Sequence, residues 1–279
     1  LRDALHLNQQ LKGRRFDGVL HFAAKSLVGE SKSNPILYYQ NNVTGTANLV
    51  NAMLKAGIPR LVFSSTAAIF GNPKRDLIDG KHPKVPINVY GQTKLTVENM
   101  LEAVTKSAGF SATCLRYFNA AGANNEANLG EWHDPETHLI PNALRAAAGT
   151  GQPLTLFGDD YSTPDGTCVR DYVHVDDLAS AHVAAIGKMK KRGVFNTYNL
   201  GNGNGYSVKE VIAACEAAVG KEIPYKIGPR REGDPATLVA SSAKARKRLN
   251  WEPKHDSISE IAESAWRWEC YRRDNLVRR

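Results

Sequence analysis

Tyr90 and Lys94 are the residues of this sequence whose types and spacing best suit chemistry, because they stand four positions apart in the segment Asn88–Lys94. Residues four apart on a helix share one face, so the lysine ammonium lies near the tyrosine phenol. A free phenol has a pKa near ~10 and is a poor base, whereas a nearby positive charge favours the phenolate. The pair therefore predicts a tyrosine that exchanges a proton near neutral pH.

Thr66 and Asn41 are two further polar residues with a possible chemical role. Thr66 closes an apolar segment with the hydroxyls Ser64-Ser65-Thr66, and it could steady the proton on the same reacting oxygen. Asn41 stands in an apolar helical segment, where it could fix a strand end or a cofactor loop. A helix cap at Thr66, a structural amide at Asn41 and a half-buried aromatic at Tyr90 explain the same residues without chemistry, and these alternatives stay open.

The elements that must position these residues alternate between strands and helices. Phe16–Ala24, Arg60–Thr66 and Ala112–Asn119 are apolar runs typical of strands buried on both faces of a parallel sheet. Helices are predicted from Asn34 to Gly57 and over about twenty residues from Asn88. This alternation predicts a doubly wound α/β fold, whose ligands bind outside the carboxyl ends of the strands.

We expect residues 1–120 to form this dinucleotide-binding type of domain and residues 121–279 to form a smaller α/β lobe. Segments near 169–201 are expected to return to the first domain. Gly201–Gly205 has the look of a phosphate-binding glycine run, but it lacks the G-x-G-x-x-G spacing. A tight turn before a helix capped by Ser207 and Glu210 explains it better. The shorter predicted elements are Leu154–Gly158, Val169–Val175, Asp176–Met189, Asn196–Leu200 and Glu222–Ile227.

The composition argues against several classes of protein. The net charge is +8, but its basic runs at 188–192, 244–248 and 272–279 have few aromatics interleaved. Solvated helix faces explain them better than a nucleic-acid surface, and a mildly positive field suits a polyanionic small molecule. No apolar run approaches the ~18 residues that span a bilayer, so no membrane is expected.

The cysteines and histidines form no recognisable metal-ligand pattern. No C-x-x-C pair occurs among the four cysteines, so neither zinc nor a disulfide framework is predicted, and reduced thiols suit a cytoplasmic protein. His133 and His138 come closest to a ligand pair, but they have no cysteine partner. We therefore expect no metal.

Short motifs along the chain are more specific than any single pair. One group consists of His21–Ala24, Val28–Ser31, Asn41–Thr46, Phe63–Ala67 and Tyr90-Gly-x-x-Lys94. A second group consists of Arg116–Asn119, Pro135–Pro141, Asp165–Tyr172, Asn199–Gly201 and Pro229–Asp234. Through the first group the chain resembles the extended short-chain dehydrogenase/reductases. Through most of the second it resembles, among them, the UDP-glucose 4-epimerases, and the resemblance covers essentially the whole chain.

The resemblance implies an NAD-dependent isomerase of UDP-hexoses. Tyr90 would take the proton from the sugar 4-hydroxyl, Lys94 would lower the Tyr90 pKa and bind the nicotinamide ribose, and Thr66 would bridge to the sugar oxygen. Besides Tyr90 and Lys94, the implied cofactor-lining residues are Phe22, Ala23, Ala24, Asn41, Ser64, Tyr117 and Phe118. Besides Thr66, the implied UDP-sugar contacts are Asn119, His138, Leu139, Leu156, Phe157, Arg170, Tyr172, Arg231 and Asp234. Two arginines suit a diphosphate clamp.

The chain departs from this family at its start. The glycine fingerprint that cradles a pyrophosphate is absent; the family carries it roughly 60 residues before the His21–Ala24 strand. Because position 1 is not Met, we expect an N-terminally truncated chain that holds NAD poorly and does not turn over by itself. The His21–Ala24 strand would then have an unpaired edge.

Other activities of the same family stay open as alternatives. A pentose or N-acetylhexosamine 4-epimerase is the nearest one, since Leu238 stands near where some members carry a large tyrosine. A dehydratase is disfavoured because Ala67 and Ala68 stand where it needs an acidic pair. The family also implies a homodimer through the helices after Pro35 and around Tyr90.

Overall fold

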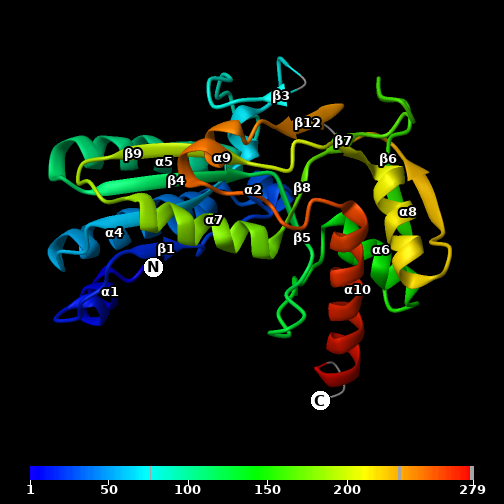
Figure 1. Ribbon diagram of the computed structural model, residues 1–279, viewed down its shortest axis with the longest axis horizontal. Helices are drawn as coiled ribbons and strands as arrows, with labels where there is room; N and C mark the ends of the chain where they lie inside the picture. Colours follow the sequence, from blue (N-terminus) through cyan, green and yellow to red (C-terminus); the bar gives the residue numbers. More distant parts are fainter. Residues whose placement is uncertain (76, 232–233, 277–279) are drawn as a thin grey trace.

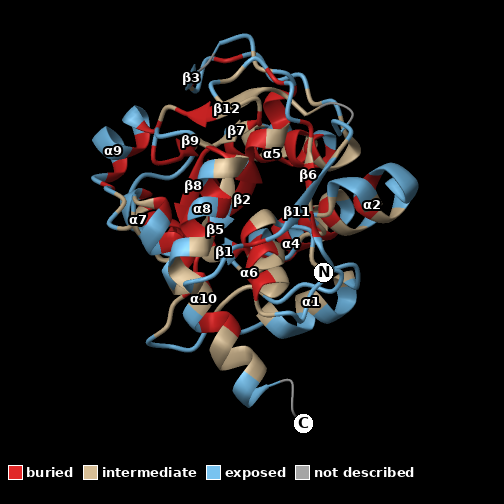
Figure 2. Cartoon of the chain, turned by 90° about the vertical axis from the view of Figure 1, so that its right-hand side faces the viewer, coloured by how far each residue is buried: buried red, intermediate tan, exposed pale blue. Residues whose placement is uncertain are grey.

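The computed structural model describes residues 1–75, 77–231 and 234–276. Figure 1 shows two parts: strands layered between helices on the left, and a second part on the right that contains the upright helix α10. Figure 2 shows the buried residues gathered on the strands and on the helix faces turned toward them. The expected division into residues 1–120 and 121–279 stays a prediction.

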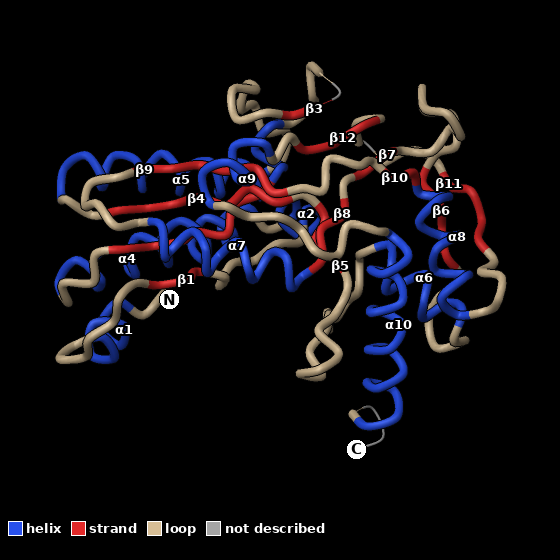
Figure 3. The backbone as a smooth tube through the Cα atoms, in the orientation of Figure 1, coloured by secondary structure: helices blue, strands red, loops and turns tan. Residues whose placement is uncertain are grey.

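A parallel sheet of order β1–β2–β4–β9 forms the centre of the first part (Figure 3). Its strands are β1 (Val19–His21), β2 (Arg60–Thr66), β4 (Ser111–Tyr117) and β9 (Phe195–Leu200). The strands β2 and β4 are buried almost throughout, as their nearly continuous apolar sequences predict. The late strand β9 joins this sheet from the second half of the chain.

Helices cover both faces of the sheet. On one face, α4 (Gly45–Lys55) and α5 (Val89–Ala108) share an apolar core with Phe63. On the other face, α7 (Val175–Lys188) and α9 (Ala243–Leu249) share a core with Leu115. This doubly wound arrangement confirms the predicted α/β fold class.

The helix expected from Asn34 onward is one helical path in three pieces. It runs through α3 (Pro35–Tyr38), a π-helical turn (Tyr39–Thr44) and α4, and it stops before Gly57, which has a positive φ of 71°. The remaining elements of this first part are α1 (Ala4–Leu11), α2 (Val28–Ser33), the 3-10 turn Ala67–Phe70 and β3 (Leu77–Ile78). Proline at the first turn fits the helix start.

The second part has its own apolar core. It lies between α6 (Leu139–Ala147), α8 (Val208–Val219) and α10 (Ile258–Asn275). The parallel pair β6 (Leu154–Phe157) and β11 (Tyr225–Gly228) flanks these helices. Short strands lie between the two parts, namely β5 (Asn119–Ala121), β7 (Val169–Arg170), β8 (Tyr172–His174), β10 (Tyr206–Ser207) and β12 (Thr237–Ala240).

Two strand predictions are wrong in extent. The run Phe16–Ala24 forms only the three-residue strand β1, and it is not buried on both faces: Leu20 is 38% exposed and Phe22 is 58% exposed. Among the described residues β1 pairs with β2 alone, so its other edge is open, as expected for the His21–Ala24 strand. The run Val169–Val175 is interrupted at Asp171, because the carboxylate of that residue binds backbone N–H groups of other segments.

Candidate active site

The first turn of α5 places Tyr90 beside the end of β2. Asn88 caps the helix, since its side-chain oxygen accepts a hydrogen bond from the Gly91 N–H at 2.8 Å. A Cβ on Gly91 would lie 2.4 Å from the carbonyl oxygen of Ala68, so only glycine allows this close approach. The helix start is thereby pressed against the turn that follows Thr66.

Lys94 lies on the same face of α5 as Tyr90, as its spacing predicts. Its Nζ is 5.8 Å from the centroid of the Tyr90 ring and donates a hydrogen bond to the Ser64 carbonyl oxygen at 2.7 Å. The side chain is buried, at 4% exposure. The hydroxyl of Thr66 lies beside the Tyr90 phenol. It also caps the following turn, because it accepts a hydrogen bond from the Ala68 N–H. The fold therefore brings Tyr90, Lys94 and Thr66 together.

Burial governs the protonation of this group. It raises the pKa of the Tyr90 phenol well above its ordinary value, with a smaller opposing effect of the Thr66 hydrogen bond. Burial also lowers the pKa of the Lys94 ammonium to about 7. The lowered Tyr90 pKa expected from the sequence is therefore not produced by the protein groups alone, because desolvation exceeds the effect of the neighbouring lysine.

We expect the stability difference between the wild type and Lys94→Met to depend on pH. The Lys94 pKa is about 7 in the folded chain against 10.5 for the free side chain, so between these values the unfolded chain binds more protons. The wild type should therefore gain stability relative to the variant as the pH rises from about 7 to about 10, by at most ~1.4 kcal/mol per pH unit. Urea unfolding at several pH values measures this. Lys106→Met, on the exposed side of the same helix, is the control, and a pH-independent difference for Lys94→Met would contradict the prediction.

A buried ion pair between Arg116 and Glu98 supports the elements that carry the site. Arg116 on β4 donates two hydrogen bonds to the Glu98 carboxylate on α5, at 2.9 and 2.6 Å. The Ser65 hydroxyl donates to the same carboxylate at 2.6 Å. These hydrogen bonds connect β2, β4 and α5 at Ser65, which stands between the site residues Ser64 and Thr66.

His182 on α7 is a site residue that the sequence did not reveal. Its Nε2 is 3.1 Å from the Ser64 Oγ, and its Nδ1 is 2.8 Å from the Leu178 carbonyl oxygen. Its ring lies against Phe22, with centroids 4.6 Å apart, and near Tyr117. A lone histidine in an amphipathic helix carries no signal of this role, because only the fold brings α7 to the end of β2.

Asn42, and not Asn41, is the asparagine that fixes a strand-end loop. Its side chain accepts from the Lys25 N–H at 2.9 Å and donates to the Lys25 carbonyl oxygen at 3.0 Å and to Thr93 Oγ1 at 3.2 Å. Asn41 is half-buried and donates to Asn42 Oδ1. In the π-helical turn Tyr39–Thr44 it is Asn42 that is buried. Regular helical spacing does not predict this inward position. The cofactor role expected of Asn41 stays a prediction.

The remaining cofactor-lining predictions lie at the carboxyl ends of three neighbouring strands. Phe22 and Ala23 are exposed beyond β1 and Ala24 is half-buried, while the Tyr117 hydroxyl bonds to Ser64 at the end of β2. Phe118 is buried in a core cluster with Ala67 and Phe70. The structure therefore collects these residues at one edge of the sheet.

The predicted UDP-sugar contacts fall into two groups. Arg170 lies 3.4 Å from the Asp234 carboxylate, and the Arg231 guanidinium lies 4.1 Å from the centroid of the Phe157 ring. His138 and Leu139 stand instead at the start of α6, where His138 is the N-terminal capping position. Glu232 and Gly233 of the motif Pro229–Asp234 lie outside the described residues, as do the last three residues of the basic run 272–279.

Strand pairing connects the arginines to the Tyr90 site. Arg170 stands opposite Leu238 on β12, and Leu238 packs against the cluster that contains Ala67 and Phe118. Asn119, the next residue along, stands opposite Tyr172 on β8. Leu156 and Tyr172 are 1% and 6% exposed as whole residues, so little of either residue is open to a ligand in this structure.

The glycine run 201–205 donates backbone hydrogen bonds to a carboxylate of the protein itself, that of Asp171. Asp171 accepts hydrogen bonds from the N–H groups of Asn202, Gly203 and Ala240, at 2.9, 3.1 and 3.0 Å. Burial still raises the pKa of Asp171, to about 6. The N–H groups that would bind a phosphate are thus engaged internally. The predicted capping box of Ser207 and Glu210 is confirmed.

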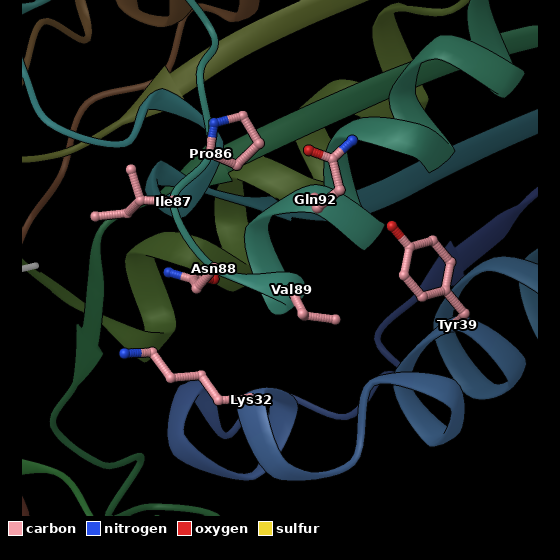
Figure 4. A pocket seen from close by; sticks show the side chains of 7 residues that line it. All are labelled: Lys32, Tyr39, Pro86, Ile87, Asn88, Val89 and Gln92. Carbon is pink, nitrogen blue, oxygen red and sulfur yellow. The ribbon is translucent and has the colours of Figure 1, made fainter.

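Figure 4 shows a surface hollow beside the first turn of α5. Its lining consists of Lys32, Tyr39, Pro86, Ile87, Asn88, Val89 and Gln92. Val89 and Gln92 lie on the side of the helix opposite to Tyr90 and Lys94, so the hollow is separate from the proton-exchanging group.

No described helix is long and apolar enough to cross a membrane.

A doubly wound sheet with a tyrosine, a lysine and a threonine at the carboxyl end of a central strand defines a dinucleotide-dependent α/β enzyme. Residues 1–201 match the model of the NAD dependent epimerase/dehydratase family, and the chain belongs to this family. It is 49% identical over 268 residues to the UDP-glucose 4-epimerase of Halalkalibacterium halodurans, which covers 96% of this chain and 80% of that protein.

The solved structures that resemble this chain include 4-epimerases of UDP-sugars. The UDP-glucose 4-epimerase from Bifidobacterium longum in complex with NAD⁺ and UDP superposes with a TM-score of 0.92 at 41% identity, over 99% of this chain and 82% of that one. The UDP-Glc/GlcNAc 4-epimerase from Campylobacter jejuni superposes with a TM-score of 0.82 at 41% identity, over 96% of this chain and 82% of that one. The NAD dependence and the Rossmann-like fold predicted from the sequence are confirmed.

The described residues fit the nicotinamide and ribose half of NAD. Phe22 offers an exposed ring beyond β1, and the three-donor ammonium of Lys94 is held by one described acceptor, the Ser64 carbonyl oxygen. The N–H groups around Gly203 are bound to Asp171, so they do not replace the missing glycine fingerprint. The predicted cofactor-lining residues of this chain concern the nicotinamide half of NAD.

Proposed function

We propose that this chain catalyses the interconversion of UDP-galactose and UDP-glucose through a 4-keto sugar. The observation that carries the proposal is the meeting of Tyr90, Lys94 and Thr66 at the carboxyl end of β2. Both solved relatives and the relative from Halalkalibacterium halodurans are named as 4-epimerases, which supports the same reaction. Bound NAD supplies the chemistry of accepting a hydride from the sugar and returning it to the opposite face.

The chain's residues handle the proton and the orientation. Tyr90, as the phenolate, takes the proton of the sugar 4-hydroxyl and, as the phenol, gives it back, while the Thr66 hydroxyl beside it steadies that oxygen. Lys94 holds the nicotinamide ribose and contributes positive charge once it is protonated. Because burial favours the neutral forms of both groups, the positive charge of the oxidised cofactor is part of what makes Tyr90 acidic enough.

The nucleotide is held at the other end of the site. We propose that Arg170 and Arg231 bind the diphosphate by charge-assisted hydrogen bonds and that Asp234 binds the hydroxyls of the uridine ribose. Strand β12 joins this end to the Thr66 region. Firm binding of UDP leaves the sugar free to turn, as transfer to both of its faces requires.

A second substrate class is favoured by Leu238. This residue is half-buried and packs beside Ala67 and Phe118, where it leaves more room than an aromatic side chain. The Campylobacter jejuni relative is named for both UDP-Glc and GlcNAc substrates. We therefore propose that an N-acetylhexosamine 4-epimerase activity accompanies the main one.

The test is an incubation of the protein, expressed from its complete coding sequence, with UDP-galactose and separately with UDP-N-acetylgalactosamine. Formation of UDP-glucose in the first case supports the proposal, and UDP-N-acetylglucosamine in the second supports the broader specificity. No conversion of either sugar by NAD-saturated protein would refute it.

Assembly and location remain proposals of the same kind. We propose a homodimer that packs through the helices following Pro35 and around Tyr90, and a cytoplasmic location. Ile36 on α3 is 68% exposed, and Ile87 just before α5 is 45% exposed. These exposed apolar side chains support the proposed dimer. The mass measured by light scattering tests it.

A further inference from the structure

Four potential metal ligands converge in the loop between β5 and α6. The ligand atoms of Glu131, His133, Glu136 and His138 all lie within 4.8 Å of one another. The Nδ1 of His133 is 2.9 Å from Glu131 Oε1 and 4.0 Å from Glu136 Oε1. The Nδ1 of His138 is 3.3 Å from Glu136 Oε1 and also contacts Glu131 Oε1. Two imidazole nitrogens and two carboxylate oxygens therefore face one point.

The spacing of these atoms fits a tetrahedral ion. Ligands ~2.1 Å from a central zinc stand about 3.4 Å from one another, and the distances above spread around that value. Two carboxylates and two neutral imidazoles also balance the charge of a divalent cation. The same Glu131 Oε1 faces the Nδ1 atoms of both histidines, so these three potential ligand atoms converge.

The surroundings hold the ligands in place. The Glu136 side chain is 3% exposed, and its Oε1 accepts hydrogen bonds from the N–H groups of Thr137 and His138 at 2.8 and 3.0 Å. Its Oε2 is buried without a hydrogen-bond partner in the described part of the chain, 3.5 Å from Arg145. Carboxylate ligands of metals are commonly oriented by such backbone donors.

Helix α10 supports the other end of the loop, which runs beside it in Figure 1. The indole N–H of Trp268 donates to the Glu131 carbonyl oxygen at 2.9 Å, and the Arg272 guanidinium lies over the Trp132 ring. Both contacts hold the N-terminal end of the ligand segment, and α6 begins directly after His138 at its other end. A fixed backbone of this kind lowers the entropy cost of assembling a metal site.

We propose that Glu131, His133, Glu136 and His138 form a binding site for one divalent transition-metal ion of the zinc class. The sequence predicted no metal because the two histidines have no cysteine partner, whereas the folded loop brings two glutamates against them. An ion bound here ties the loop to His138, the cap of α6, and so sets the position of Leu139. The role of the ion is positional, since nothing places it at the Tyr90 group.

Zinc binding to the untagged protein, stripped of metal by a chelator, tests the proposal. We expect about one Zn²⁺ per chain in competition with a chromophoric chelator, and a tetrahedral absorption spectrum when Co²⁺ replaces it. His133→Ala should lower the zinc affinity by at least ~10–100-fold, the loss that removal of a supporting residue already causes. His133→Cys, which keeps a ligand atom, should restore most of the binding.

His6→Ala is the matched control, because His6 is an exposed histidine on α1 far from the loop in the sequence. It should bind zinc as the wild type does. His133 is 44% exposed in its side chain, so its replacement should leave the circular dichroism spectrum and the unfolding midpoint without metal unchanged. Absence of stoichiometric zinc binding, or unchanged affinity in His133→Ala, would overturn the proposal and leave a purely ionic cluster.

Discussion

Replacing Tyr90 with Phe is expected to lower kcat for UDP-galactose epimerisation by about 10²–10⁴-fold while the affinity for UDP changes little. The hydroxyl that is removed is the only group of Tyr90 that exchanges a proton, and Thr66 cannot take over because its own hydroxyl is a much weaker acid. The ring itself remains, so the packing of α5 against β2 is preserved. Steady-state kinetics with protein expressed from its complete coding sequence measure the change.

The control for this prediction is Tyr225→Phe. Tyr225 lies on β11 and is 41% exposed, so the same loss of a hydroxyl should leave kcat unchanged. UDP binding measured by calorimetry separates a loss of chemistry from a loss of the site. A Tyr90→Phe enzyme that retains more than about a tenth of the wild-type kcat would show that another group moves the proton.

Replacing Glu98 with Ala is expected to lower the free energy of unfolding by about 3–5 kcal/mol, because it leaves the Arg116 guanidinium buried without its counterion. Arg116 is 2% exposed and cannot reach water without rearrangement. The Ser65 hydroxyl loses its acceptor at the same time. A loss of this size is a large part of the total stability of a typical domain.

Glu102→Ala on the same helix is the matched control. Glu102 forms an exposed pair with Lys106 at 2.8 Å, and such pairs contribute only about 0.3–0.5 kcal/mol. Urea unfolding of both variants against the wild type gives the comparison, with the m-value as a check on the transition. Similar losses in the two variants would mean that the Glu98–Arg116 pair adds no more than a surface contact.

The local sequence determined the elements that depend on nearest neighbours. The four-residue spacing of Tyr90 and Lys94 in the segment that opens at Asn88 predicted α5, and the apolar run Arg60–Thr66 predicted β2 to the residue. The capping box at Ser207 was predicted in the same way. These features follow from short-range hydrogen bonding and from which faces are apolar, both of which are written in adjacent residues.

Tertiary structure decided the features that depend on distant segments. Strand β1 is short and exposed because no described strand covers its outer edge, which its apolar sequence does not reveal. His182 reaches Ser64 across 118 positions of the chain, and the glycine run after β9 turns its N–H groups to Asp171. No local pattern encodes such contacts.

Tyr90 and Lys94 show where the two kinds of information divide. Their spacing placed them on one helix face, and the structure confirms that neighbourhood at 5.8 Å between the Lys94 Nζ and the Tyr90 ring centroid. Their pKa values did not follow from spacing, because burial raises the pKa of one and lowers that of the other. Sequence fixes which groups are adjacent along a helix, whereas the depth of the site in the folded chain sets their charge.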